Sequence, residues 1–482
     1  MKIGLAQLNT HVGAIETNTD KVLVSACQAR DELGCDLIVY PELTLSGYPP
    51  EDLLLHKGMQ KRVIEALEVV RRDVMGITLC LGYPEYEDKN LFNSGIVLRD
   101  GQVLANHRKW ILPNYAVFDE KRYFEAGTDS TVVELSGIHF ALTICEDAWE
   151  PEPCHAAADA GAEILLVING SPYHMHKQSM RETILGERAR EIGLPLVYVN
   201  MVGGQDELVF DGGSVAIDAE GRTLMRAPAF EEGIYLVEVE RGSSDICLRE
   251  QELAPVLSTE EAVYKALVLG TRDYVNKNGF KNVVLGLSGG VDSALTLCVV
   301  VDALGADRVR TVMMPSRYTS KMSLEDSAKQ AAKMGVQHDV LSIEPIFESI
   351  RGVLTDVFEG LPENTTEENI QARCRGLLLM AISNKLNCML LTTGNKSEMA
   401  VGYATLYGDM AGGFAPLKDC SKSLVYALAK YCNSTEDVIP KRVISREPSA
   451  ELRMDQKDTD SLPSYALLDP ILEAFIERDY SV

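Results

Sequence analysis

The stretch VVLGLSGGVDSAL, residues 283–295, decides the fold of the second half of the chain. Its first five residues form a short apolar run of strand length, typical of a strand buried on both faces. The Gly/Ser-rich turn 288–293 follows at once, and Ala294–Leu304 is apolar enough for a buried helix. A strand that leads through such a turn into a helix points several backbone N–H groups at one place. The stretch therefore predicts a phosphate-binding loop.

The residues of this turn refine the prediction. Gly289 and Gly290 let the backbone approach an anion closely, and Ser288 and Ser293 add hydroxyl donors. Asp292 would repel a bare phosphate, so its presence predicts Mg²⁺ between the two. The simpler alternative is an ordinary Gly-rich turn between a strand and a helix. The turn is not a Walker A motif, because no Gly-Lys-Ser/Thr follows.

The turn resembles the SGGxDS pyrophosphate loop of the N-type ATP pyrophosphatases, which split ATP into AMP and pyrophosphate while they adenylate a substrate. This resemblance implies that ATP is bound by Gly286, Leu287, Ser288, Gly289, Gly290, Val291, Asp292 and Ser293.

Composition limits the class of protein. A chain of 482 residues with 46% apolar and 24% charged residues is expected to fold into two or three domains with ample core. The net charge of −25 argues against nucleic acid or an anionic membrane as the main partner. The sequence pattern leads us to expect neither a signal peptide nor a membrane span. The 11 cysteines have no metal-type spacing, which predicts free thiols in a reducing cytoplasm.

The first half alternates between strand and helix patterns, which predicts layered α/β structure. Catalytic side chains in such folds gather in the loops just beyond strand ends. Helices are expected at 18–33 and 60–74, with another ending at 192, and strands are expected at 2–8, 35–43, 77–85, 91–99, 140–149, 163–173, 194–203 and 213–221.

Glu42, Lys109 and Cys145 each lie near such a strand end. Taken alone, each has an ordinary explanation as a solvated or core residue. Together they have complementary chemistry: Glu42 can deprotonate the thiol and return the proton to leaving ammonia, while Lys109 can stabilise an oxyanion. Their order resembles the Glu, Lys, Cys triad of the nitrilase (carbon–nitrogen hydrolase) superfamily. That resemblance implies an αββα sandwich.

The same resemblance implies roles for further residues. Glu120 matches a second carboxylate that supports the triad. The amino-acid head group of glutamine is expected at Tyr115, Ser171 and Lys177, with Tyr48 a looser candidate. Separately, His174 and His176 form an H-x-H pair, but the sequence offers no third ligand at a spacing suited to a metal.

The second half begins after a stretch without periodicity. We expect an amidase domain at 1–240, a linker at 241–259, and a Rossmann-like parallel-sheet domain at 260–482. Helices are expected at 260–277, 323–334 and 369–384, and strands at 308–320, at 339–343 and from 389.

Three motifs of this half coincide: SGGVDSA (288–294), ENIQARCRG (368–376) and LTTGNKSEMAVGYATLYGD (391–409). Together they resemble the NAD⁺ synthetases, as does PSAEL at 448–452. The resemblance implies that Thr393 contacts ATP, that Lys422 meets the ATP phosphates, that Glu398 binds Mg²⁺ or substrate, and that Asn369 contacts deamido-NAD⁺. Asp292 and Glu398 are the expected Mg²⁺ ligands.

A nitrilase-type amidase followed by a synthetase is the pattern of the glutamine-dependent NAD⁺ synthetases. It implies that Cys145 releases ammonia from glutamine and that ATP adenylates deamido-NAD⁺, which ammonia then converts to NAD⁺. It also implies a homodimer, or a larger homo-oligomer, built through the second half, where Leu377–Met380 is apolar. Members of this family continue into a basic tail that is expected to be trimmed or missing here, so we assign no dinucleotide-binding residue beyond position 422.

Two alternatives remain. Another ATP pyrophosphatase could amidate GMP or aspartate, or thiolate tRNA, although the amidase folds of the first two differ and the charge of −25 opposes tRNA. A binding or regulatory protein with inactive sites is the second alternative. Both catalytic sets are complete, and only equilibrium binding without turnover would favour that reading.

Overall fold

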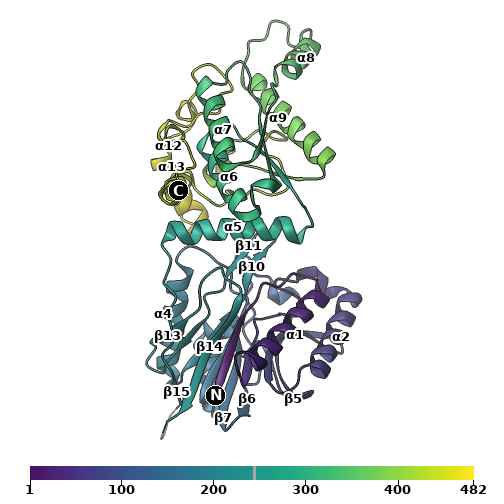
Figure 1. Ribbon diagram of the computed structural model, residues 1–482, viewed down its shortest axis with the longest axis vertical. Coiled ribbons are helices and arrows are strands. Elements are labelled where there is room, and N and C mark those ends of the chain that lie inside the picture. Colours follow the sequence, from purple (N-terminus) through teal and green to yellow (C-terminus); the bar gives the residue numbers. More distant parts are fainter. Residues whose placement is uncertain (243–245, 482) are drawn as a thin grey trace. The chain divides into compact units, whose positions relative to one another are not determined.

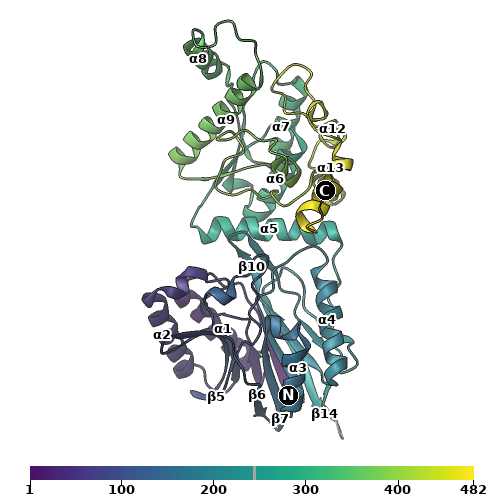
Figure 2. The same cartoon turned by 180° about the vertical axis from the view of Figure 1, so that it is seen from behind.

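The computed structural model describes residues 1–242 and 246–481, shown from two sides in Figures 1 and 2. The chain divides into two compact units, Met1–Ala262 and Val263–Val482, and we describe each by itself. Residues 243–245 of the predicted linker and residue 482 of the predicted second domain lie outside the described residues.

The first unit contains two large sheets. A two-stranded ribbon accompanies them, formed by β10 (Val202–Gln205) and β11 (Leu208–Asp211). The seven-stranded sheet has the order β15-β14-β1-β2-β3-β4-β5, with β1 (Lys2–Gln7), β2 (Leu37–Val39), β3 (Thr78–Glu87), β4 (Asn90–Arg99), β5 (Gln102–Arg108), β14 (Gly233–Arg241) and β15 (Ile246–Leu248). The six-stranded sheet has the order β13-β12-β9-β8-β7-β6, with β6 (Thr131–Leu135), β7 (Ile138–Ile144), β8 (Ile164–Asn169), β9 (Leu196–Asn200), β12 (Val215–Ile217) and β13 (Thr223–Arg226).

Helices cover the outer face of each sheet, which confirms the predicted αββα sandwich. Helices α1 (Ile15–Asp31) and α2 (Lys57–Asp73) pack on the first sheet, and α3 (Pro151–Asp159) and α4 (Lys177–Ile192) on the second. Strand β8 shows why its sequence is continuously apolar. Leu166 and Ile168 enter the core between the sheets, whereas Leu165 and Val167 enter the core beneath the helices.

Part of the stretch expected as a linker is ordered on the first unit. Strand β15 pairs antiparallel with β14, where Val239 lies opposite Leu248. Further along, the backbone N–H of Gln251 donates to Leu224, and that of Ala254 donates to Arg226. Leu224 and Arg226 belong to β13, the edge strand of the six-stranded sheet. The segment therefore has fixed hydrogen-bond partners although its sequence is aperiodic.

The second unit is built on a parallel sheet with the order β18-β17-β16-β19, as the sequence predicts. Its strands are β16 (Val283–Gly286), β17 (Val309–Met313), β18 (Gln337–Val340) and β19 (Met389–Leu391). Its helices are α5 (Thr259–Lys277), which begins at the end of the first unit, α6 (Val291–Leu304), α7 (Lys321–Met334), α8 (Glu344–Leu354), α9 (Thr365–Leu386), α10 (Lys396–Ala400), α11 (Lys422–Thr435), α12 (Lys441–Ser445) and α13 (Tyr465–Leu472).

The strand, turn and helix predicted from residues 283–295 are present, but the helix starts earlier than expected. Helix α6 begins at Val291 rather than Ala294, so Asp292 and Ser293 lie in its first turn. Gly289 adopts φ +82°, and a Cβ added there would lie 2.6 Å from the carbonyl oxygen of Ser323. Only glycine fits this close approach without moving the backbone.

Two expectations from composition can be compared with the structure. All eleven cysteines are free thiols. Within residues 1–242 and 246–481, none of the helices has the length and apolarity needed to span a bilayer.

Candidate active sites

The first unit brings Glu42, Lys109 and Glu120 into direct contact. Lys109 Nζ donates to Glu42 Oε1 at 2.8 Å and to Glu120 Oε1 at 2.9 Å. Lys109 comes directly after β5, and Glu42 follows β2. Both side chains are fully buried, so the ion pairs are screened little by water.

Cys145 lies at the sharp turn where β7 ends and the short helix η3 (Cys145–Ala148) begins. Its φ is +48°, which is unusual for a residue other than glycine and marks a backbone held under strain. The side chain is buried, and the charges of Glu42 and Lys109 both act on it. Strained positions of this kind are frequent at reactive residues.

Burial and neighbouring charges shift the pKa values of Lys109, Glu120 and Cys145. Burial opposes the charged ammonium of Lys109, but the carboxylates of Glu120 and Glu42 outweigh it and hold its pKa well above the usual value. Burial raises the pKa of Glu120 to about 7 against the attraction of Lys109. Burial and Glu42 also raise the pKa of the Cys145 thiol. A neutral thiol needs a base when it attacks, and Glu42 is placed to be one.

Sequence reasoning missed the groups that orient Glu42. Asn93 Nδ2 donates to Glu42 Oε1 at 2.7 Å, and the backbone N–H of Gly170 donates to Oε2 at 2.8 Å. Asn93 and the neighbouring Ser94 are buried polar residues within strand β4, and this polar pair inside a buried strand is the signal that the sequence offers. Tyr48, a looser candidate for glutamine binding, donates its hydroxyl to Glu120 Oε1 at 2.9 Å.

The predicted head-group residues lie on segments next to Cys145. The Tyr115 hydroxyl donates to Glu146 Oε1 at 2.8 Å, and Lys177 Nζ lies 4.0 Å from the centre of the Trp149 ring. Burial lowers the pKa of Lys177 and raises that of Glu146. Ser171 is buried, and its backbone N–H donates to the side-chain oxygen of Asn200 at 2.9 Å. The Lys177 ammonium and the Glu146 carboxylate have the charges needed to pair with the carboxylate and the ammonium of a zwitterionic amino acid.

The H-x-H pair gains no support as a metal site. His176 lies at the N-terminal end of α4 with φ +66°, and His174 Nδ1 lies 2.9 Å from the carbonyl oxygen of Met175. In the part of the chain that the structure describes, no three His, Cys, Asp or Glu side chains are grouped for a metal ion.

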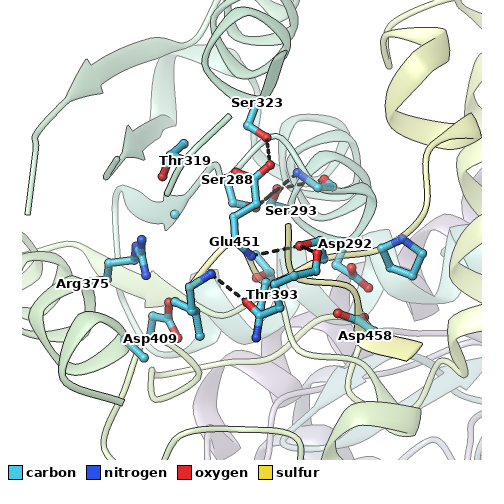
Figure 3. A pocket seen from close by; sticks show the side chains of 18 of the residues that line it. Ser288, Asp292, Ser293, Thr319, Ser323, Arg375, Thr393, Asp409, Glu451 and Asp458 are labelled. Atoms are coloured by element: carbon cyan, nitrogen blue, oxygen red, sulfur yellow. Dashed lines mark hydrogen bonds between the residues drawn. The ribbon is translucent and has the colours of Figure 1, made fainter. Parts of the chain in front are cut away.

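The second unit contains a cavity of about 790 Å³ at the carboxyl edge of its parallel sheet (Figure 3). The sites expected to bind ATP, deamido-NAD⁺ and metal meet there. The lining includes Gly286, Leu287, Ser288, Gly290, Val291, Asp292, Ser293, Asn369, Thr393, Glu398 and Lys422. Gly289 is buried against Ser323 just behind this wall.

Asp292, Glu398 and Lys422 form a charged cluster in the cavity. Lys422 Nζ donates to Asp292 Oδ2 at 2.6 Å and to Glu398 Oε1 at 2.9 Å, while Asn395 donates to Asp292 Oδ1 at 2.8 Å. Burial and the negative charge of Asp292 raise the pKa of Glu398 to about 7. Two carboxylates suit Mg²⁺, which commonly takes one or two protein carboxylates together with substrate phosphates. The donor set therefore fits the predicted metal.

Glu451 of the PSAEL segment contacts Ser323 at the start of α7, and Arg446, just before that segment, contacts the pyrophosphate loop; sequence reasoning predicted neither contact. Ser323 Oγ donates to Glu451 Oε1 at 2.8 Å, and Arg446 donates to Ser323 Oγ and to the carbonyl oxygen of Gly289. Figure 3 shows Glu451 reaching Ser323, and shows Arg375 and Asp409 on the cavity wall. Arg375 is half-buried, and loss of solvation lowers its pKa.

Comparison with known families matches both units. The carbon-nitrogen hydrolase family matches residues 2–245, and the NAD synthase family matches residues 263–482.

Full-length relatives share this arrangement. The chain is 47% identical over 483 residues to the glutamine-dependent NAD(+) synthetase of Acinetobacter baylyi, covering 100% of this chain and 88% of that one. It is 41% identical over 518 residues to the enzyme of the same name from Thermotoga maritima, covering 99% and 89%.

Solved structures agree at the level of the fold. The glutamine-dependent NAD⁺ synthetase of Acinetobacter baumannii, solved with ADP, matches with a TM-score of 0.90 and 46% identity over 100% of this chain and 88% of that one. The glutamine-dependent NAD(+) synthetase of Cytophaga hutchinsonii matches with a TM-score of 0.85 over 100% and 87%. At 22% identity, the second likeness concerns the fold alone.

Proposed function

This chain belongs to the glutamine-dependent NAD⁺ synthetases, which are ATP-dependent ligases, and we propose how its two sites divide that activity. The first site, around Cys145, releases ammonia from glutamine. The second, around Asp292, activates deamido-NAD⁺ and joins the ammonia to it.

In the first site Cys145 Sγ attacks the amide carbon of glutamine while Glu42 takes the thiol proton. Lys109 donates to the oxyanion that forms, and Glu42 returns its proton to the leaving nitrogen, so ammonia departs and a thioester remains. Water then hydrolyses the thioester to glutamate. The contact of Lys109 with both Glu42 and Glu120 supports this scheme, because it keeps the ammonium charged inside the core.

Glutamine is held by groups of opposite charge. Lys177 is the partner for its α-carboxylate and Glu146 for its α-ammonium, with Tyr115 and Ser171 adding hydroxyl groups. The position of Glu146 next to Cys145, bonded to Tyr115, supports this assignment. Tyr48 is better placed to fix Glu120 than to touch glutamine.

In the second site ATP lies with its phosphates over residues 288–293. The carboxylate of deamido-NAD⁺, near Asn369, attacks the α-phosphorus and pyrophosphate leaves; ammonia then attacks the carboxyl carbon and AMP leaves. Thr393 contacts ATP, and Lys422 moves from the carboxylates to the phosphates. Asp292 and Glu398 would hold Mg²⁺, which supplies charge neutralisation on the leaving pyrophosphate.

Chelation of Mg²⁺ is expected to stop pyrophosphate release while glutamine hydrolysis continues.

Two properties of the whole protein are also proposed. On α9, Leu377 is 62% and Met380 40% exposed while Leu379 is buried, so part of the apolar run faces outward. This face supports a homo-oligomer built through the second unit. The eleven free thiols support a reducing cytoplasm as the compartment.

The observation that carries the proposal is Lys109 bridging Glu42 and Glu120 beside the strained Cys145. Incubation with ATP, Mg²⁺, deamido-NAD⁺ and either glutamine or ammonium, followed by mass spectrometry for NAD⁺, tests it. Cys145→Ala is expected to lose at least a thousandfold with glutamine and little with ammonium, because adenylation uses no group of the first site. Cys27→Ala, an exposed cysteine on α1, is the control and should keep both activities. Equal loss of both activities in a folded Cys145→Ala protein would refute the division.

A further inference from the structure

Asp147 is a fully buried carboxylate that the scheme above does not use. It lies two residues after Cys145 and is 0% exposed. Three backbone N–H groups donate to it: those of Trp110 and Ile111 reach Oδ1 at 3.0 and 2.8 Å, and that of Ile144 reaches Oδ2 at 3.0 Å. These three bonds give both oxygens of the buried carboxylate a hydrogen-bond partner.

These bonds connect the two segments that carry the reacting groups. Trp110 and Ile111 immediately follow Lys109, and Ile144 immediately precedes Cys145. Trp110 and Ile111 lie 37 and 36 residues before Asp147, and Ile144 lies three residues before it, so the link is tertiary as well as local. Asp147 Oδ1 accepts both bonds from the segment after Lys109, and Oδ2 accepts the bond from the residue before Cys145.

The imidazole of His107, also buried beside Asp147, does not replace this link. His107 Nε2 lies 3.6 Å from Asp147 Oδ2, too far for a hydrogen bond. Cys145 has φ +48°, and a strained residue keeps its conformation only when its surroundings fix it. The bond to the N–H of Ile144 fixes the residue just before the strain.

We propose that Asp147 is a positioning residue that sets the distance and direction between the Lys109 ammonium and the Cys145 sulfur. This inference rests on the proposed role of Cys145 as the nucleophile. Asp147 touches no reacting atom; it acts through the backbone of residues 110, 111 and 144. Its loss therefore slows the attack of Cys145 and leaves the affinity for the glutamine head group unchanged.

The test is the alkylation of Cys145 by a diazo-ketone analogue of glutamine, followed over time at several concentrations by mass spectrometry of the intact protein. This separates the maximal rate of alkylation, the concentration for half-maximal rate, and the fraction of protein that reacts. Asp147→Asn is isosteric, and its amide has one accepting oxygen, so it can serve one segment but not both. Asp147→Ala serves neither. Asp218→Asn is the matched control, because Asp218 is buried in the same unit and accepts the N–H of Arg222 within its own turn.

We expect Asp147→Asn to lower the maximal rate roughly 100-fold, the order of loss that follows a misplacement of about 1 Å, with the half-maximal concentration unchanged. Asp147→Ala should lose more, and Asp218→Asn should react as the wild type does. A role in folding alone predicts a smaller reacting fraction at the wild-type rate. That outcome, or a wild-type rate in Asp147→Asn, would overturn the inference.

The same experiment tests its premise separately. If the analogue fails to label Cys145 in the wild type, or labels Cys145→Ala equally well, the proposed nucleophile is wrong. Synthesis of NAD⁺ from ammonium, measured on each variant, reports whether the second unit is intact.

Discussion

At the scale of single residues, the first site depends on charges that are buried and paired. Lys109 is stable in the core because Glu42 and Glu120 both face it. Burial disfavours the charged form of Glu120 and raises its pKa to about 7. Breaking a buried pair by removing one partner leaves an uncompensated charge, so these residues cannot be exchanged singly without consequence.

This raised pKa predicts how the stability of the first unit varies with pH. A carboxyl whose pKa is higher in the folded protein binds its proton more tightly there, so its contribution to stability is present below the unfolded value and is lost as pH rises through about 7. Relative to Glu120→Gln, the free energy of unfolding of the wild type should therefore fall between pH ~5 and ~8, by on the order of 1 to 3 kcal/mol.

Urea unfolding followed by tryptophan fluorescence measures this contribution, because Trp110 and Trp149 are the only tryptophans and both lie in the first unit. Glu125→Gln, a change at an exposed residue of the same loop, is the control. A difference between wild type and Glu120→Gln that stays constant with pH would show that Glu120 does not titrate in this range.

Site residues could be predicted from the sequence where their immediate neighbours in the chain indicate their role. Cys145 and Glu42 follow strands, and Asp292 lies in a recognisable turn. Asn93 and Asp147 could not be assigned in the same way, because their partners come from distant parts of the chain. Lys109 illustrates the difficulty: the run His107-Arg108-Lys109 resembles a solvated surface, yet Lys109 is buried among carboxylates.

At the scale of elements, both sites lie where strands end. The helix pattern of residues 294–304 placed α6 correctly but missed its first turn, because Asp292 and Ser293 are typical turn residues. Strands β5, β6, β11, β13, β14 and β15 were not predicted. They are short or mostly half-exposed, so their apolar alternation is weak.

The glycine behind the pyrophosphate loop offers a test at this scale. In Gly289→Ala the new methyl group would meet the backbone of Ser323, so the loop must shift. We expect ATP-dependent pyrophosphate release to fall at least tenfold, with alkylation of Cys145 unchanged. Gly335→Ala is the matched control: it also has positive φ, but no atom lies within 4 Å of the added carbon.

That control should cost about 1 kcal/mol of stability and keep its activity. Release of pyrophosphate at the wild-type rate by Gly289→Ala would mean that the loop tolerates displacement and does not hold the phosphates closely.

At the scale of the whole molecule, the outward apolar residues of α9 bear on assembly. We expect light scattering at low micromolar concentration to give a dimer mass or larger. Leu377→Asp should shift the mass toward the monomer, because a buried charge opposes an apolar interface. Val353→Asp, at an exposed position of α8, is the control. A monomer mass for the wild type with full activity would contradict the proposed oligomer.

The central claim is that nitrogen freed from glutamine at Cys145 becomes the amide of NAD⁺ formed at the Asp292 site. The most direct measurement supplies glutamine carrying a heavy nitrogen isotope in its amide, with ATP, Mg²⁺ and deamido-NAD⁺, and determines the mass of NAD⁺. The account predicts heavy NAD⁺ from the wild type. From Cys145→Ala given the same glutamine plus unlabelled ammonium, it predicts only light NAD⁺. Heavy NAD⁺ from the Cys145→Ala protein, or light NAD⁺ from the wild type without added ammonium, would contradict it.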